Sequence, residues 1–302
     1  ISATTRSGTN NLEGSVFFFH RNDALQSDFD IRGNERTADF YNSQYGVSLG
    51  GPLIKDKLHF YTVFERQDAG EPEFIADIQN EDDENRLGIT RENLDRYQDI
   101  ARRIYGVSDA PQVGQFDRVT EANTWFARLD WQINDKHRLT LRNNWNKWDN
   151  PFSVSDNSSI ELAESWSDFS SMENSTLLSL RSAFSSTLLN ELKVQYQHAE
   201  RAFVPSSQLP QSNIPRAIVD VNSVLPNGSN RTLTVQLGGQ RFTPETNQAN
   251  MIQFTNTTYL SSGRLNFTFG TDNMNTPLHT LLSNEHTCRL FFHSPHDFPH
   301  PT

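Results

Sequence analysis

The residues best suited to hold a metal ion are gathered near the C-terminal end of the sequence. Imidazole and thiolate groups bind zinc and copper, and the candidates of these two kinds are Cys288, His293, His296 and His300. Prolines at positions 295, 299 and 301 preclude a helix that would present the histidines on one face. We therefore expect no metal site, and the single cysteine excludes an internal disulfide.

A second candidate is the acidic run EDDE at positions 81–84. Carboxylates suit calcium, but this run lacks the glycine-punctuated alternation of a calcium-binding loop, so we expect a solvated loop. The sequence also lacks a nucleophile elbow, an HExxH motif and a glycine loop that would cradle a phosphate. We therefore expect a protein that is not an enzyme and uses no cofactor.

The remaining candidates are charged side chains that share one face of predicted β-strands. They are Arg128, Asp130, Arg138, Arg142, Glu191 and Lys193. Such a row could contact a passing solute or another part of the protein. For any single residue, the favoured interpretation is ordinary charge pairing between neighbouring strands.

The strands that position these charges are clearest in residues 123–146. Apolar residues occupy the odd positions in both arms of this stretch, except for Asn143, while the even positions are charged or polar, except for Phe126. A period of two is typical of a β-strand. The two arms predict an antiparallel hairpin with its turn at residues 134–136, because directly opposed residues must share a face. The expected facing pairs are Trp125 with Trp145 and Leu129 with Leu141.

Composition limits the class of protein. The chain has 302 residues, a net charge of -11 and a pI near 5.3, which argues against a nucleic-acid partner because phosphate binding needs a basic surface. No stretch approaches the roughly 18 to 20 uninterrupted apolar residues of a membrane helix. A barrel strand instead alternates lipid-facing and lumen-facing residues, so a mean hydropathy of -0.65 is compatible with a membrane barrel.

Nine strands are predicted along the chain. Their approximate starts are Leu12, Tyr41, Leu58, Asn123, Arg138, Ser175, Leu188, Gln248 and Arg264. Connections of about three to five residues alternate with connections of about twenty to fifty, which is typical of a barrel with tight periplasmic turns and long external loops. We predict an all-β fold: a partial transmembrane antiparallel β-barrel, arranged as a meander whose first strand does not pair with its last.

The long connections are expected to be mainly solvated loops. They cover residues 66–122, 147–174 and 201–247. Helical spacing of apolar residues predicts a short surface helix at residues 90–106, with a threonine at its start and a glycine at its end. Two small β-like pieces are expected near Ile218 and Leu233.

The apolar face of the predicted strands carries the candidates for lipid contact. The main ones, including tryptophans that would anchor the protein at the membrane interface, are Trp125, Leu129, Trp131, Leu141 and Trp145. The alternative is aromatic packing in a soluble core. If the barrel interpretation is right, apolar side chains should be exposed in the isolated chain, namely Val16, Tyr45, Val47, Leu129, Trp131, Leu141, Val194 and Phe267.

Four stretches of the sequence resemble the TonB-dependent outer-membrane receptors, especially the Oar-like branch with a carboxypeptidase-regulatory-like N-terminal domain. They are TRSGTNNLEGSVFFFHRN at 5–22, YGVSLGGPLIKDKLHFYTVFE at 45–65, WFARLDWQINDKHRLTLR at 125–142 and FTFGTDNM at 267–274. The likeness runs in the right order over nearly the whole chain. The N-terminal regulatory domain, the TonB-contacting box, most of the plug and the distal strands have no counterpart here, so the resemblance implies a fragment.

The resemblance also implies a domain organisation and a function. Residues 1–10 would be the C-terminal end of the plug, residues 11–276 the N-terminal part of a barrel of about twenty-two strands, and residues 277–302 an irregular tail. The whole protein would lie in the outer membrane and take up a bulky, unknown solute. Its partners would be outer-membrane lipid and, through the absent N-terminal region, a TonB-type energy-coupling complex. Two alternatives are a barrel acting mainly as a surface adhesion or structural protein and, more weakly, a soluble secreted β-protein.

Overall fold

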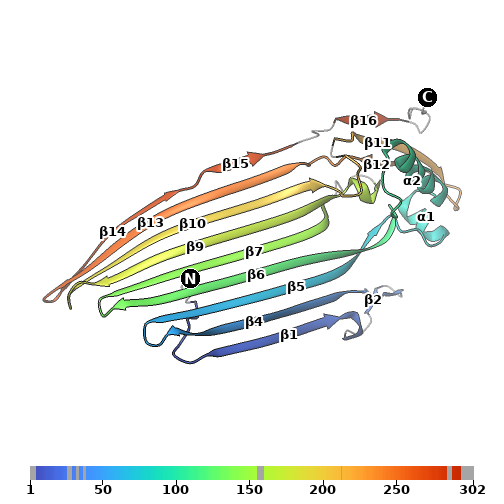
Figure 1. Ribbon diagram of the computed structural model, residues 1–302. Helices are drawn as coiled ribbons and strands as arrows, with labels where there is room; N and C mark the ends of the chain where they lie inside the picture. The colour runs from blue at the N-terminus through green and yellow to red at the C-terminus, as the bar shows by residue number, and fades with distance from the viewer. Residues whose placement is uncertain are drawn as a thin grey trace.

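A computed structural model gives the fold of most of the chain. It describes residues 5–25, 29–31, 34–36, 39–154, 160–211, 213–283 and 288–293. Long antiparallel strands form a curved wall, and two helices with a small second sheet lie together at one end of it (Figure 1). We call these two regions the wall and the cap. No helix of the described residues is long and apolar enough to cross a membrane.

The wall is a sheet whose strands follow one another in chain order. Its strands are β1 (Glu13–Asn22), β4 (Tyr41–Ile54), β5 (Leu58–Ile75), β6 (Gly114–Asn134), β7 (His137–Val154), β9 (Ser167–Ala183), β10 (Leu188–Pro205), β13 (Glu245–Ser262), β14 (Leu265–Asn275) and β15 (Leu278–Leu281). The order is β1-β4-β5-β6-β7-β9-β10-β13-β14, with β15 also on β13, and neighbours are antiparallel. Among the described residues β1 does not pair with β14, so the wall is an open sheet. The predicted all-β meander, whose first strand does not pair with its last, is confirmed.

Several wall strands are longer than predicted. β6 begins at Gly114 and not near residue 123, and β9 begins at Ser167 and not near residue 175. The extra residues are mostly polar, with isolated apolar side chains such as Phe116 and Phe169, so the regular apolar alternation that marks a half-buried strand is absent from them. Parts of the expected loops 66–122 and 147–174 are therefore strand.

The register of the central hairpin is as predicted, but its turn differs. Trp125 pairs with Trp145 and Leu129 with Leu141. Asn134 pairs with His137, so the turn has only two residues, and the register shifts between Gln132 and Asn134. A two-residue turn alone would place the apolar residues of the two arms on opposite faces. The bulge adds one residue to β6, so the apolar residues still share a face, as the predicted three-residue turn would have allowed.

Short and long connections are sorted to opposite ends of the wall. The tight turns all lie at the end away from the cap (Figure 1). The long connections between β5 and β6, β7 and β9, and β10 and β13 lie at the cap end (Figure 1). This sorting confirms the predicted alternation of loop lengths.

The cap is assembled from those long connections and from the segment that follows β15. Its elements are α1 (Glu81–Leu87), α2 (Arg91–Tyr105), β8 (Ile160–Glu161), η2 (Ala163–Ser165), β11 (Arg216–Val224), β12 (Asn230–Gly238) and β16 (Arg289–Phe292). The strands form a second sheet in the order β16-β11-β12-β8. Near β1, the chain also forms η1 (Asp23–Leu25) and a two-stranded hairpin of β2 (Phe29–Ile31) and β3 (Asn34–Arg36).

The cap has its own hydrophobic core. Its buried members are Ile78, Ile89, Leu94, Tyr97, Ala101, Val107, Leu162, Leu209, Ala217, Val219, Val221, Val235 and Leu237. The predicted helix is confirmed as α2, with the Thr90 side chain capping its start and Gly106 in the left-handed conformation at its end. It is not only a surface helix, since Leu94, Tyr97 and Ala101 belong to this core.

Described residues of the predicted irregular tail form strands. β15 pairs with β13 directly beyond the end of β14, so the edge strand of the wall resumes after an interruption at Thr276 and Pro277. Proline has no backbone N–H to donate to a ladder, which accounts for a break at this point. β16 pairs in parallel with β11 in the cap.

Candidate functional site on the polar face of the wall

In the wall, apolar side chains on one face are exposed and a charged side chain on the other face is buried, which is the reverse of a water-soluble sheet. On β6, Asp130 is 4% exposed, whereas its neighbours Leu129 and Trp131 are 37% and 45% exposed. All eight apolar side chains expected to be exposed are so. Of the five main lipid candidates, four are exposed and Trp145 is half-buried. Toward the tight turns, the face that carries Leu129 and Trp131, which we call the outer face, is thus apolar, and the opposite, inner face carries Arg128 and Asp130.

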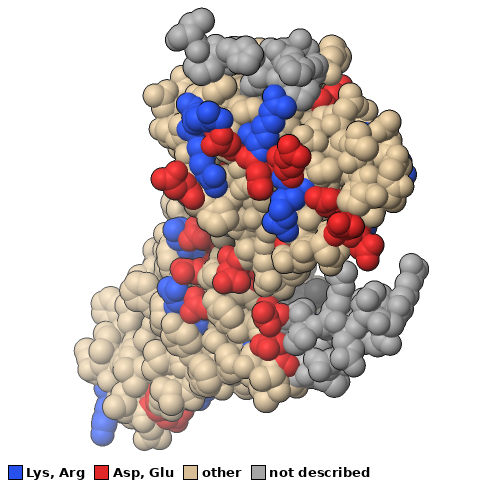
Figure 2. Space-filling view, turned by 90° about the vertical axis from the view of Figure 1, so that its right-hand side faces the viewer, with Lys and Arg blue, Asp and Glu red and all other residues tan. Residues whose placement is uncertain are grey.

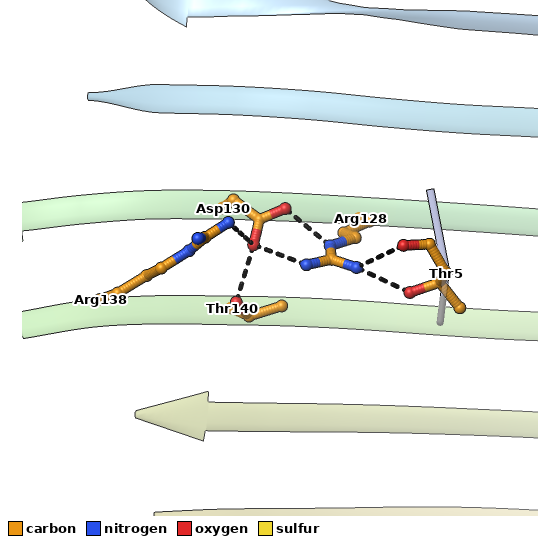
Figure 3. A network of polar contacts seen from close by, with 5 residues as sticks. All are labelled: Thr5, Arg128, Asp130, Arg138 and Thr140. Carbon is orange, nitrogen blue, oxygen red and sulfur yellow. Dashed lines mark hydrogen bonds and ion pairs between the residues drawn. The ribbon is translucent and has the colours of Figure 1, made fainter. Parts of the chain in front are cut away.

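Asp130 is the centre of a polar network on that second face (Figure 3). Arg128 donates to its carboxylate through Nε at 2.6 Å and Nη2 at 2.9 Å. Arg138 Nη2 donates to Asp130 Oδ1 at 3.1 Å, and the Thr140 hydroxyl donates to the same oxygen at 2.8 Å. Four donor contacts stabilise this nearly buried carboxylate, which would otherwise be costly to desolvate.

Arg128 also ties the N-terminal segment to the wall. Its Nη1 donates to the Thr5 carbonyl oxygen at 2.9 Å and to Thr5 Oγ1 at 2.7 Å (Figure 3). At the other end of the segment, Asn10 Oδ1 accepts from the backbone N–H of Asp56 at 2.9 Å. Between them, a Cβ added at Gly8 would lie 2.1 Å from the Phe60 carbonyl oxygen, so only glycine permits this close approach. Residues 5–10 therefore lie against the polar side of the wall.

The other predicted charges lie on the same face of neighbouring strands. Lys193 Nζ and Glu191 Oε2 are 3.0 Å apart. Arg142 lies directly opposite Arg128 in the β6–β7 pair. Arg181 on β9 was not among the predicted residues, although it lies opposite both Arg138 and Glu191. Arg181 directly follows Leu180, which lies on the apolar face, so the period-two alternation of this strand could have placed Arg181 on the polar face.

Comparison with known proteins identifies the family. The model of the outer membrane beta barrel domain family matches residues 4–75 and 105–292, which is most of the chain. The chain belongs to this family. It is a protein of the outer membrane.

A solved outer-membrane transporter shares the fold of this chain. The outer membrane transporter YddB from Escherichia coli superposes with a TM-score of 0.55 at 10% sequence identity, over 90% of this chain and 32% of that one. The siderophore receptor PirA from Acinetobacter baumannii gives a TM-score of 0.49 at 15% identity, over 91% of this chain and 31% of that one. The chain thus spans less than a third of the length of these proteins. No curated protein sequence matches it.

Membership of the barrel family predicts what surrounds each face of the wall. Outer-membrane barrels carry an apolar band on the outside and a polar interior. We therefore expect the face that carries Leu129 and Trp131 to contact lipid and the face that carries Arg128 and Asp130 to line the lumen. A cavity of about 450 Å³ lies on the inner side, between residues 6–15 and strands β4 and β5.

The candidate metal residues do not come together in the part of the chain that the structure describes. No three His, Cys, Asp or Glu side chains of the described residues form a possible metal-binding group. Cys288 is exposed, and His293 Nδ1 lies 3.5 Å from Asp220 Oδ2. His296 and His300 lie outside the described residues. The acidic run at 81–84 is not a loop as predicted; it forms the first turn of α1, whose start Asn80 caps.

Proposed function

We propose that the chain is the N-terminal part of the barrel of a TonB-dependent outer-membrane receptor of the Oar-like branch. In this proposal the complete protein takes up a bulky solute, and a TonB-type complex that engages a region N-terminal to this chain supplies the energy. The protein acts as a transporter and catalyses no reaction. Outer-membrane lipid surrounds the apolar face of the wall.

The observation that carries this proposal is the course of residues 5–10. A chain that reaches the first barrel strand along the inner face has come from within the barrel, as the end of a plug would. Arg128 holds Thr5 by two hydrogen bonds on that face. An empty pore or a purely structural barrel has no need of a segment anchored inside its wall. The fold shared with an outer-membrane transporter is consistent with the proposal.

Uptake can be tested although the solute is unidentified. Cells with and without the complete gene would be grown in the same rich medium, each with and without an uncoupler of the proton-motive force. Mass spectrometry of the medium should reveal a solute that disappears only when the gene is present and the membrane is energised. If the solute is depleted equally with and without the uncoupler, or equally by both strains, energy-coupled uptake is contradicted.

The cap favours a second function, adhesion at the cell surface. It is a folded unit with a core of its own, unlike a set of flexible loops. If binding to a surface partner is its main role, removing β11 and β12 should abolish adherence of the cells and leave solute depletion unchanged. Loss of depletion without loss of adherence would instead support the transport role.

A further inference from the structure

The charged residues of the inner face form an ordered array on four adjacent strands, β6, β7, β9 and β10. Directly paired residues define three rows across these strands. The rows are Arg128, Arg142, Leu177 and Gln195; then Asp130, Thr140, Ser179 and Lys193; then Gln132, Arg138, Arg181 and Glu191. The array therefore combines five cations with two carboxylates, in a chain whose net charge is -11.

Like charges face each other twice within this array. Arg128 lies opposite Arg142, and Arg138 lies opposite Arg181. Like charges directly opposed on neighbouring strands are destabilising unless an anion lies between or above them. The arrangement thus has a cost that ordinary charge pairing between strands would avoid.

The two carboxylates leave two of the five cations without a partner. Asp130 binds Arg128 and Arg138, and Glu191 binds Lys193. The side chains of Arg142 and Arg181 make no hydrogen bond or ion pair with any residue that the structure describes. Arg142 Nε is also buried from solvent without a hydrogen-bond partner there. A buried donor of a charged group that lacks an acceptor is unfavourable, so an acceptor is expected from elsewhere.

We propose that Arg142 and Arg181 form a binding site for an oxyanion, a carboxylate or a phosphate, on the inner face of the wall. Arg142 pairs with Leu177, four residues from Arg181, so the two arginines stand roughly 13 Å apart along the strands at ~3.3 Å per residue. Their extended guanidinium groups can converge on one anion above Ser179 or hold two groups of a larger one. The planar guanidinium fork can donate two parallel hydrogen bonds to two oxygens of either a carboxylate or a phosphate group.

This proposal deepens the proposed function, because the site is reachable by a solute only if the inner face lines a transport path. The same chemistry has two possible sources. One is a free anionic solute, and the other is a carboxylate of the complete protein that packs against the wall. The two sources differ in one measurable respect: only the first leaves the site open to added anions.

Thermal unfolding of the complete protein in detergent micelles tests the site. The wild type and an Arg142→Gln/Arg181→Gln variant would be compared in phosphate-free buffer and with added inorganic phosphate or citrate. A ligand that binds only the folded state raises the unfolding temperature by mass action. The control is Arg118→Gln, because Arg118 lies on the wall near the cap and already pairs with Glu71 and Glu73.

If the site takes a solute, the wild type and the control are stabilised by phosphate or citrate and the double variant is not. Each single variant should bind the anion about tenfold more weakly or worse, as expected when a charge-assisted contact is lost. If a carboxylate of the same protein fills the site, the wild type does not respond, and the double variant alone is less stable in phosphate-free buffer.

Two outcomes overturn the proposal. In one, the double variant responds to phosphate and citrate as the wild type does. In the other, neither protein responds and the double variant is at least as stable as the wild type, which would mean that the arginines merely repel each other. If the double variant does not fold, the single variants give the same comparison. The assay needs no energy coupling, so its result is independent of whether uptake is observed.

Discussion

The wall and the cap bury different parts of the same chain. In the cap, apolar side chains such as Leu237 and Val219 are completely hidden, and charged residues of both signs cover the outside of α1 and α2 (Figure 2). In the wall, apolar side chains such as Val16 are exposed and the carboxylate of Asp130 is hidden. The cap thus has a polar surface suited to aqueous solvent, whereas the outer face of the wall requires an apolar environment.

This difference predicts that similar substitutions have different effects in the two regions. A side chain removed from the cap leaves a cavity, because the surrounding core relaxes only partly. A side chain removed from the outer face of the wall leaves a space that lipid tails can fill. The following predictions test this contrast, beginning with the largest expected effect.

Leu237→Ala should destabilise the cap by about 2 to 5 kcal/mol, the usual cost of a large-to-small change in a packed core. Leu237 is fully buried in β12. The matched change in the wall is Leu141→Ala, which alters a side chain 40% exposed on the outer face and should cost clearly less. Hydrogen exchange of cap and wall amides in the complete, membrane-embedded protein measures both. Equal losses would remove the contrast.

Leu129→Lys should destabilise the wall in a bilayer by about 2 to 4 kcal/mol, because Leu129 lies in the middle of the apolar run of β6 and a charge there would face lipid. The control is Gln195→Lys on the inner face of β10, where a charge remains hydrated. Denaturant titration of the complete protein refolded into lipid vesicles compares the two variants.

Spin labels give an independent check of the same faces. A label at position 129 should be accessible to a lipid-soluble quencher, and one at position 128 should not. Similar accessibility of the two labels would contradict the assignment of the faces.

The junction of cap and wall contains a buried carboxylate, Glu164. It is fully buried just before β9, and its Oε1 accepts from the backbone N–H of Gly238 at 3.3 Å. Its other oxygen has no hydrogen-bond partner among the described residues. Burial raises the pKa of Glu164 from 4.5 to about 8, because the ionised form is poorly solvated there.

Glu164 should therefore make cap stability depend on pH. A carboxyl whose pKa is raised on folding contributes fully below its unfolded pKa of 4.5, and that contribution is lost as the pH rises to about 8. The loss should approach about 1.4 kcal/mol per pH unit within this window. Glu164→Gln should abolish the dependence, whereas Glu92→Gln, on the exposed side of α2, should keep it. Exchange rates of cap amides, corrected for intrinsic pH effects, decide between these results.

Thr90→Ala should have the smallest effect, about 1 kcal/mol, through loss of the cap at the start of α2. The Thr90 hydroxyl accepts from the backbone N–H of Asn93 at 3.4 Å. Thr90→Ser retains this acceptor and should retain most of the stability. Local hydrogen exchange at the first turn of α2 measures the change, and the wall should not respond.

The structure of the wall could be predicted from the sequence to a greater extent than that of the cap. The wall strands were predictable because period-two alternation is local, and the facing of Trp125 and Trp145 follows from parity alone. Strand ends beyond the apolar band were missed because residues there are mostly polar and their few apolar side chains do not alternate regularly. The core of the cap was not predictable, since Leu94, Leu162 and Val219 meet from three separate connections that carry no shared periodic pattern.

The candidate site was predictable only in part. Alternation placed Arg128, Asp130, Arg138 and Arg142 on one face, but a pattern within one strand does not say which charge meets which. The contact of Arg128 with Thr5 spans 123 positions of sequence, and nothing near either residue indicates it. Arg181 was overlooked although the same alternation contains it.

The length of the wall strands sets how far the cap stands from the membrane. β6 has 21 residues, about 70 Å at ~3.3 Å per residue, whereas the apolar band of such barrels is only ~25 Å tall. Even a strongly tilted strand of this length reaches well beyond the lipid headgroups and carries the cap with it. Because the long connections of such barrels lie on the outside of the cell, we expect an antibody to meet α1, α2 and β11 before it meets the membrane. Variation in these elements can change what the cell displays without altering the barrel.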